Sequence, residues 1–325
     1  MYSQIMVPTD GSGFDREAIL VALRVAEQCR AKVRLVRVVT VGTQFGAGAS
    51  EHGALPSLEA LRAEHDAALS ELYALAAECR GISDVDLTVD LEHGPPTDVL
   101  PGYARRNEID LVVISTHGRR GIARLSLGSV TDSLIRGTAI PVLVVKPKAS
   151  YLKPEAIKEF RRIVVPLDGS LLAEQILSRV IPLAKLENSE ITLVQVVRPS
   201  QHCHEDAEKD VPWWEKGVAR AKAYLTQIAI DVRVRGVAAR IDVVVGEQVA
   251  QTITDFARRE RADLIAIATH GRGTLGRILR GSVADGVTKY AVSSILVFHP
   301  EGFLEERLPD GLVERATGTE PVFAA

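Results

Sequence analysis

The sequence has few cysteines, no long apolar run and no excess of basic residues, and each shortage argues against a class of protein. Three cysteines in 325 residues, without CxxC spacing, indicate a reduced interior rather than a disulfide framework. No stretch reaches the roughly 18 apolar residues of a membrane-spanning helix, and the first residues, MYSQIMVPTDGS, lack the pattern of a secretory signal. Lys and Arg number 39 against 42 Asp and Glu, so bulk charge recruits neither nucleic acid nor an anionic membrane. We therefore expect a cytoplasmic protein without nucleic-acid or membrane partners.

Common motifs of catalysis and metal binding are missing as well. No GxxxxGK[ST] sequence supports a motor-type or kinase-type ATPase, and no GxSxG sequence supports a serine hydrolase. The run from His202 to Asp206 contains metal-ligand residue types, but neighbouring positions point apart. The sequence therefore predicts no metal site and no metabolic enzyme of these classes.

The chain instead contains an internal duplication. IMVPTDGS at residues 5–12 matches IVVPLDGS 158 residues later, and DLVVISTHGRRG from Asp110 matches DLIAIATHGRGT 153 residues later. The length also fits about two domains of roughly 150 residues. We expect a first domain over 1–148, a linker over 149–160, a second domain over 161–299 and a tail over 300–325.

Each half alternates short apolar runs with helical patterns, which is typical of an α/β fold with a parallel sheet covered by helices. Five strands and four helices are expected per half. The expected strands are 5–8, 33–39, 85–91, 111–114 and 142–145, then 163–166, 191–197, 239–245, 264–268 and 295–298. The expected helices are 15–30, 58–80, one from about Asp98 with Pro101 in its first turn, and 129–136, then 171–185, about 215–230, about 248–259 and one from Ser282. Trp213 and Trp214 are expected in a loop, where they anchor a partner or pack beneath the chain.

A glycine loop follows the fourth strand of each half. Gly118 precedes Gly128-Ser129 by nine intervening residues, and Gly271 precedes Gly281-Ser282 by the same spacing. Glycines and a helix start present backbone amides and a positive dipole end, which suit phosphate groups. The alternative is that both serines only cap their helices in capping boxes, with Asp132 and Asp285 three residues on.

The first strand of each half ends in an Asp-Gly-Ser sequence. Asp10 and Asp168 would lie at the carboxyl end of a parallel strand, where ribose hydroxyls find a hydrogen-bond acceptor. The alternative is that Asp-Gly-Ser makes a tight turn and that Ser12 caps the next helix.

With these motifs in place, both halves resemble the universal stress protein family. The resemblance rests on PTDGS and PLDGS, on STHG and ATHG, and on the two GSV helix starts. It implies two open, Rossmann-like five-stranded parallel sheets in strand order 3-2-1-4-5 with helices on both faces. It also implies ATP binding, with Mg²⁺, through Gly-x2-Gly-x9-Gly-Ser/Thr, whose first glycine is replaced here by Ser115 and Ala268.

The same resemblance implies a role for each remaining site position. Asp10 and Asp168 would hold ribose, the backbone at Val38 and Val196 would meet adenine, and Pro8 and Pro166 would wall the base pocket. The last strands, PVLVVK from Pro141 and SILVFH from Ser294, would pair and make the chain its own pseudo-symmetric dimer, with pairing of two tandem chains a further option.

These features favour a nucleotide-responsive stress regulator with unidentified protein partners. A weak ATP hydrolase remains open, because His117 and His270 flank the loops, although no second catalytic group is spaced with them. A nucleotide-free interaction scaffold also remains open, because the first glycines are missing. Ser115 can return a hydrogen bond whereas Ala268 cannot, so we expect the first half to hold ATP more tightly.

Overall fold

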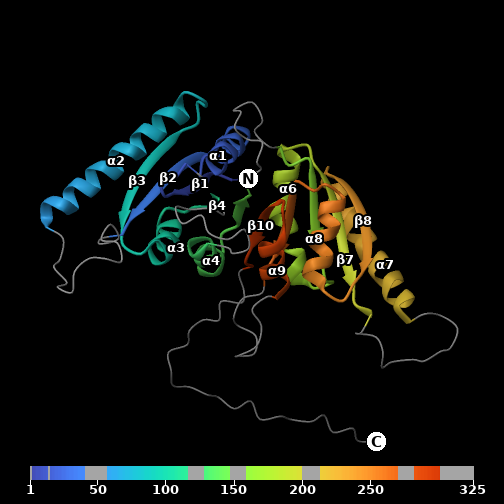
Figure 1. The fold of residues 1–325 in the computed structure, drawn as a ribbon. Helices are drawn as coiled ribbons and strands as arrows, with labels where there is room; N and C mark the ends of the chain where they lie inside the picture. Colours follow the sequence, from blue (N-terminus) through green and yellow to red (C-terminus); the bar gives the residue numbers. More distant parts are fainter. Residues whose placement is uncertain are drawn as a thin grey trace, which may run out of the picture.

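The protein, in a computed structural model, forms one ten-stranded sheet with helices on both faces (Figure 1). The structure describes residues 2–13, 15–40, 57–115, 128–146, 159–199, 213–269 and 282–300. The strand order is β3-β2-β1-β4-β5-β10-β9-β6-β7-β8. Each half contributes five neighbouring parallel strands in the order 3-2-1-4-5, so the expected fold class is confirmed.

The element bounds follow the apolar runs of the sequence. The first half contains β1 (Gln4–Thr9), α1 (Arg16–Cys29), β2 (Lys32–Val39), α2 (Leu58–Arg80), β3 (Leu87–His93), α3 (Pro96–Arg106), β4 (Leu111–Ser115), α4 (Ser129–Gly137) and β5 (Val142–Val145). The second contains β6 (Arg162–Pro166), α5 (Leu171–Glu174), α6 (Leu177–Leu186), β7 (Glu190–Val197), α7 (Trp213–Val234), β8 (Ala238–Val245), α8 (Val249–Arg259), β9 (Leu264–Ala268), α9 (Ser282–Tyr290) and β10 (Ser294–Phe298).

The two faces of the sheet have separate cores because side chains alternate along each strand. On the α1/α7 face, defined by helices α1, α2, α6 and α7, one apolar cluster runs across both halves and includes Val7, Leu143 and Leu296. On the α4/α9 face, defined by α3, α4, α8 and α9, each half has its own cluster, with Ile135 packed against both. The α1/α7 core therefore joins the halves as a continuous layer.

The helix around Asp98 begins earlier than the sequence suggested. Pro96 starts α3, so Pro101 lies in its second turn rather than its first. Proline cannot donate a hydrogen bond to the carbonyl four residues before it, which here belongs to Thr97. The Ser133 hydroxyl donates to that Thr97 oxygen, so a neighbouring helix satisfies the acceptor that Pro101 leaves unpaired.

Three further bounds differ from expectation. The predicted helix 171–185 is two helices, since Gln175 and Ile176 turn with bonds to carbonyls three residues back, upstream of Pro182. Trp213 and Trp214 open α7 instead of lying in a loop, and β3 begins two residues later than predicted. Helix and strand ends are the least determined part of a sequence pattern, so these differences are confined to the ends or breaks of single elements.

The two halves meet at their last strands, as predicted. β5 and β10 pair antiparallel, with Leu296 opposite Leu143 and Ile295 opposite Val144. Both leucines are fully buried. The antiparallel direction follows from the approximate two-fold symmetry between the halves, and the pairing removes two apolar sheet edges from solvent.

A buried ion pair adds a second contact between the halves. The guanidinium of Arg24 in α1 pairs with the carboxylate of Glu187 just after α6, and its plane lies over the Phe160 ring, 5.4 Å from the centroid. The Glu187 side chain is fully buried. Because a buried charge is costly without its partner, the pair fixes how α1 packs against α6.

Lys146 makes a third contact across the junction, directly after β5. Its Nζ donates to the carbonyls of Thr288 (2.8 Å) and Ala291 (2.7 Å) at the end of α9. Burial lowers the pKa of Lys146 from 10.5 to about 8. A neutral amine still carries two N–H donors, so both hydrogen bonds survive loss of the proton.

We expect Lys146 to make the folded chain more stable as pH rises from about 8 toward 10.5. Over this range the folded state has released the lysine proton while the unfolded state still binds it, so the free energy of unfolding increases with pH. Urea unfolding from pH 7.5 to 10 would measure the slope. Buried Cys29 and Cys79 have raised pKa values and act in the opposite direction, so the slope is compared with that of Lys146→Met. Identical slopes would refute the role of Lys146.

Candidate nucleotide site

The Asp-Gly-Ser sequences form matching turns at the carboxyl ends of β1 and β6. Asp10 Oδ1 accepts a hydrogen bond from the Ser12 amide at 2.8 Å, and Asp168 Oδ1 accepts one from the Ser170 amide at 2.9 Å. The glycine between each pair has a positive φ, +72° at Gly11 and +88° at Gly169. Turn-making is therefore a real role of both aspartates, and it uses the Oδ1 atom of each.

The serines of these turns act differently in the two halves. Ser170 caps α5, since its hydroxyl accepts from the Ala173 amide at 3.1 Å. The alternative in which Ser12 caps α1 is wrong, because Asp15 is the N-cap residue there. Ser12 lies three positions before the N-cap, outside the first turn of α1.

The expected base-pocket residues lie on one face of neighbouring strands. The Val38 and Val196 side chains pack on the α4/α9 face, and Pro8 and Pro166 share that face by strand alternation. Both prolines are buried and both valines are partly buried. The structure thus brings Pro8, Asp10 and Val38 to one sheet edge, and their second-half counterparts likewise.

Only part of each glycine loop lies within the described residues. Gly118, Gly271 and Gly281, the Ser282 side chain, and His117 and His270 fall outside them. Gly128 is the N-cap residue of α4 and Ser129 its exposed first residue, without a side-chain cap bond. Asp132 instead pairs with Arg136, so the capping-box alternative is wrong for the first half.

The positions that replace the first family glycine end the fourth strand of each half. Ser115 is the last residue of β4 and Ala268 the last residue of β9, and both are buried. A small side chain therefore stands at the start of each glycine loop.

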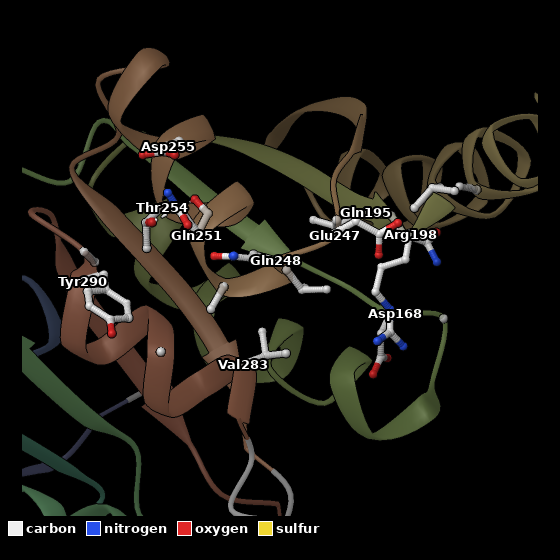
Figure 2. A pocket seen from close by; sticks show the side chains of 18 of the residues that line it. Asp168, Gln195, Arg198, Glu247, Gln248, Gln251, Thr254, Asp255, Val283 and Tyr290 are labelled. Carbon is white, nitrogen blue, oxygen red and sulfur yellow. Dashed lines mark hydrogen bonds between the residues drawn. The ribbon is translucent and has the colours of Figure 1, made fainter. Parts of the chain in front are cut away.

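A cavity of about 1580 Å³ opens over the carboxyl ends of β6 and β7 in the second half (Figure 2). Asp168 and Val196 line it, as does Val283 beside Ser282 in the first turn of α9. The cavity therefore touches the expected ribose and adenine positions of this half, and it reaches the residue next to the expected phosphate position at Ser282. Its remaining wall comes from α7, α8, the rest of α9, the end of β7 and the residues that follow β8, and Figure 2 shows Gln248, Gln251 and Thr254 along the α8 side.

The cavity has an arm on the α1/α7 face, which we define by Gln195, Gly217, Arg220, Ala221 and Tyr224. Gln195 precedes Val196 on β7, so strand alternation turns its side chain to the face opposite the expected base pocket. Gly217 and Ala221 have little or no side chain, which leaves room between β7 and α7. The arm adjoins Asp168 and Gly169, since the Cβ position of Gly169 lies 3.8 Å from Gln195 Nε2.

Two polar groups of the arm have defined states. The Tyr224 hydroxyl donates to Glu174 Oε1 at 3.0 Å, and burial together with this hydrogen bond raises its pKa, so it stays protonated. The Gln195 Oε1 atom is buried and has no hydrogen-bond partner among the described residues. The Gln195 amide is therefore not held in place by a hydrogen bond through its oxygen.

An ion pair occupies the corresponding space in the first half. Arg37 corresponds to Gln195 at the 158-residue offset, and Glu71 corresponds to Tyr224 at the 153-residue offset that also matches Leu72 with Leu225. Arg37 Nη1 lies 2.6 Å from Glu71 Oε2, and Arg37 is buried. A Cβ on Gly11 would stand 3.0 Å from Arg37 Nη1, so the guanidinium packs directly against the Asp-Gly-Ser turn.

The arm residues were missed by motif reasoning from the sequence. They belong to no glycine or aspartate motif, and the small and aromatic residues of α7 read as an ordinary helix face. A comparison of the two halves position by position provides the signal. Directly before the matched valines, Val38 and Val196, the first half has Arg37 and the second half has Gln195.

Other candidate sites gain no support within the described ranges. No group of three or more His, Cys, Asp or Glu side chains among the described residues could hold a metal ion, and residues 202–206 lie outside them. Among the same residues, no helix is long and apolar enough to cross a membrane. Trp214 is partly exposed at the start of α7, and the Trp213 side chain lies outside the described residues.

Known proteins match both halves of the chain. A universal stress protein of Methanocaldococcus jannaschii is 34% identical over 146 residues, which is 45% of this chain and 83% of that protein. The crystal structure of an Archaeoglobus fulgidus universal stress protein superposes with a TM-score of 0.67 at 16% identity, covering 91% of this chain and 98% of that one. A solved universal stress protein in complex with cAMP is 20% identical, with a TM-score of 0.34, and covers 44% of this chain and 98% of its own.

The sequence model of the Universal stress protein family matches residues 1–146 and again residues 159–299. The two matches contain the two five-stranded halves that meet at β5 and β10. Together they cover far more than half of the chain. The chain therefore belongs to the universal stress protein family, with two domains of that family in tandem.

Proposed function

We propose that this protein binds an adenine nucleotide, ATP with Mg²⁺, and acts as a nucleotide-responsive regulator of a stress response rather than as a metabolic enzyme. The observation that carries the proposal is the second-half cavity, which touches Asp168, Val196 and the first turn of α9 together. Ligands of open α/β sheets bind outside the carboxyl ends of the strands, near the point where strand order reverses. The cavity lies at that point, beside β6.

Each wall supplies a group that suits one part of the nucleotide. The Asp168 carboxylate would accept from ribose hydroxyls, and the Val196 backbone would meet the adenine edge, with Pro166 on the same face. The start of α9 would bring amides and a positive dipole end to the phosphates, with Gly271, Gly281 and Ser282 as the loop. Asp10, Val38, Pro8, Gly118, Gly128 and Ser129 would do the same in the first half.

Magnesium fits this arrangement as a partner of the phosphates. Mg²⁺ in nucleotide sites is usually held by phosphate oxygens, waters and one or two carboxylates. The cavity offers Asp168 and Glu247 as carboxylates near the nucleotide position. When bound, the ion would neutralise phosphate charge.

Native mass spectrometry of the purified chain, with identification of the released small molecules, tests the proposal directly. We expect adenine nucleotide in the preparation or, after its removal, saturable ATP binding by titration calorimetry in Mg²⁺ buffer. If ATP neither co-purifies nor binds at millimolar concentration while circular dichroism shows a folded chain, a nucleotide-free scaffold replaces the proposal. Ser115 and Ala268, in place of glycine, are the features that favour that alternative.

Hydrolysis is tested separately, because binding alone requires none. We expect phosphate release from ATP by the wild type to match that of the Gly128→Ala, Gly281→Ala double variant, since no described pair of groups forms a base and a positioned nucleophile. A colorimetric phosphate assay over hours would measure it. Release above that of the double variant would establish a weak hydrolase.

A further inference from the structure

We infer that the arm beside Asp168 makes the second site specific for an adenine nucleotide with an additional phosphate on its ribose 2′- or 3′-hydroxyl. This inference rests on the proposed nucleotide site and assigns a ligand class to it. It begins from the difference between the two halves at the Asp-Gly-Ser turn. The first half fills this space with the Arg37–Glu71 ion pair, and the second half leaves it open.

The direction of the arm determines which part of a nucleotide can enter it. Base and phosphates would lie on the α4/α9 face, at Val196 and the first turn of α9. A ribose held by Asp168 turns its 2′- and 3′-hydroxyls toward that carboxylate, and the arm starts at the neighbouring Gly169 and Gln195. A substituent on either hydroxyl would therefore extend into the arm, away from base and 5′-phosphates.

The chemistry of the arm favours an anionic substituent. Arg220 belongs to the arm, and Arg198 lines the cavity near Asp168 (Figure 2). Guanidinium groups are well suited to phosphate because they donate two parallel hydrogen bonds. The Tyr224 hydroxyl is protonated and Glu174 is its acceptor, so this carboxylate is already engaged. Asp168 and Glu247 also line the cavity, and neither is one of the residues that define the arm.

Gln195 adds an adaptable group at the point where the arm begins. Its Oε1 atom is buried and accepts no hydrogen bond from the described residues, so rotation of the amide breaks no hydrogen bond to this oxygen. A rotated amide can donate its N–H groups to a phosphate oxygen, or accept from the ribose hydroxyl that remains. The residue at the same position of the first half, Arg37, is fixed by Glu71 instead.

Titration calorimetry with three probes tests the inference on the full chain: AMP, adenosine 3′,5′-bisphosphate and adenosine 2′,5′-bisphosphate. We expect one bisphosphate to bind at least about tenfold more tightly than AMP, at one site per chain, because a hydrogen bond to a charged group is worth about that factor or more. The preferred isomer identifies the hydroxyl. The Gln195→Arg, Tyr224→Glu double variant rebuilds the first-half ion pair and should bring the bisphosphate-to-AMP ratio to near one, as should Arg220→Gln.

Arg240→Gln is the matched control. Arg240 lies on the edge strand β8, pairs with Glu190 of β7 and does not line the cavity. It should leave the ratio at the wild-type value. If AMP binds and neither bisphosphate binds more tightly, the inference is overturned while the proposed nucleotide function stands. If the Gln195→Arg, Tyr224→Glu double variant still prefers the bisphosphate over AMP as strongly as the wild type does, the additional phosphate lies elsewhere and the inference is also overturned. If ATP binds but none of the three probes does, the inference alone is overturned, whereas binding of neither ATP nor any probe overturns both.

Discussion

Replacement of Leu296 by lysine should unfold the junction between the two halves and destabilise the whole chain by about 4 kcal/mol or more. Leu296 lies opposite Leu143 in the β5–β10 pair, at the centre of a ten-stranded sheet, and is fully buried in the core that both halves share. A lysine there loses the apolar contacts and buries an ammonium group without a counter-ion. Because the free energy of unfolding of natural domains is about 5–15 kcal/mol, this loss is a large share of the total stability.

Thermal unfolding by circular dichroism, with light scattering for aggregation, would measure this effect. Leu143→Lys should behave alike, because its side chain points into the same layer. Val234→Lys is the matched control, since Val234 at the end of α7 is 80% exposed and a lysine there remains hydrated. A monomeric Leu296→Lys chain with an unchanged melting temperature would show that β5–β10 pairing does not hold the halves together in solution.

Local pattern and internal duplication were sufficient to predict the architecture. The apolar runs specify strands because both faces of a parallel sheet are covered, and their two copies in matched order predict two equal halves. Pairing of the last strands followed from the need to cover two apolar edges. The structure confirms this in the register of Leu296 with Leu143.

Features that depend on tertiary neighbours could not be predicted in this way. The position of Pro101 in the second turn of α3 is tolerated because Ser133, a residue of another helix, satisfies the Thr97 carbonyl. Ser129 lies one residue inside α4, so a capping-box pattern in the sequence does not form one in the fold. The open arm likewise depends on two residues, Gln195 and Tyr224, that only the folded chain brings together.

Loss of the Asp168 side chain should weaken nucleotide binding at the second site by roughly 10- to 150-fold. The factor corresponds to about 1.5–3 kcal/mol for a hydrogen bond to a charged group. Asp168→Ala should affect the second site alone and Asp10→Ala the first alone, so calorimetry on the two variants separates two affinities within one chain. We expect the first site, which has Ser115 where the second has Ala268, to bind ATP more tightly. Asp10→Ala should therefore weaken the tighter of the two binding events, and Asp168→Ala the weaker one.

The turn that these aspartates make must be separated from any contact with ribose. Asp168 Oδ1 holds the Ser170 amide and hydroxyl, so an alanine removes the turn acceptor together with the carboxylate. Asp168→Asn is the matched variant, because an asparagine oxygen still accepts from the Ser170 amide while the negative charge is gone. A ribose contact that needs the charge is weakened in both variants, whereas a pure turn role is rescued by asparagine. Unchanged nucleotide affinity and stoichiometry in both alanine variants, with melting curves that show an intact fold, would make the aspartates turn-formers only and the nucleotide-free scaffold the better account.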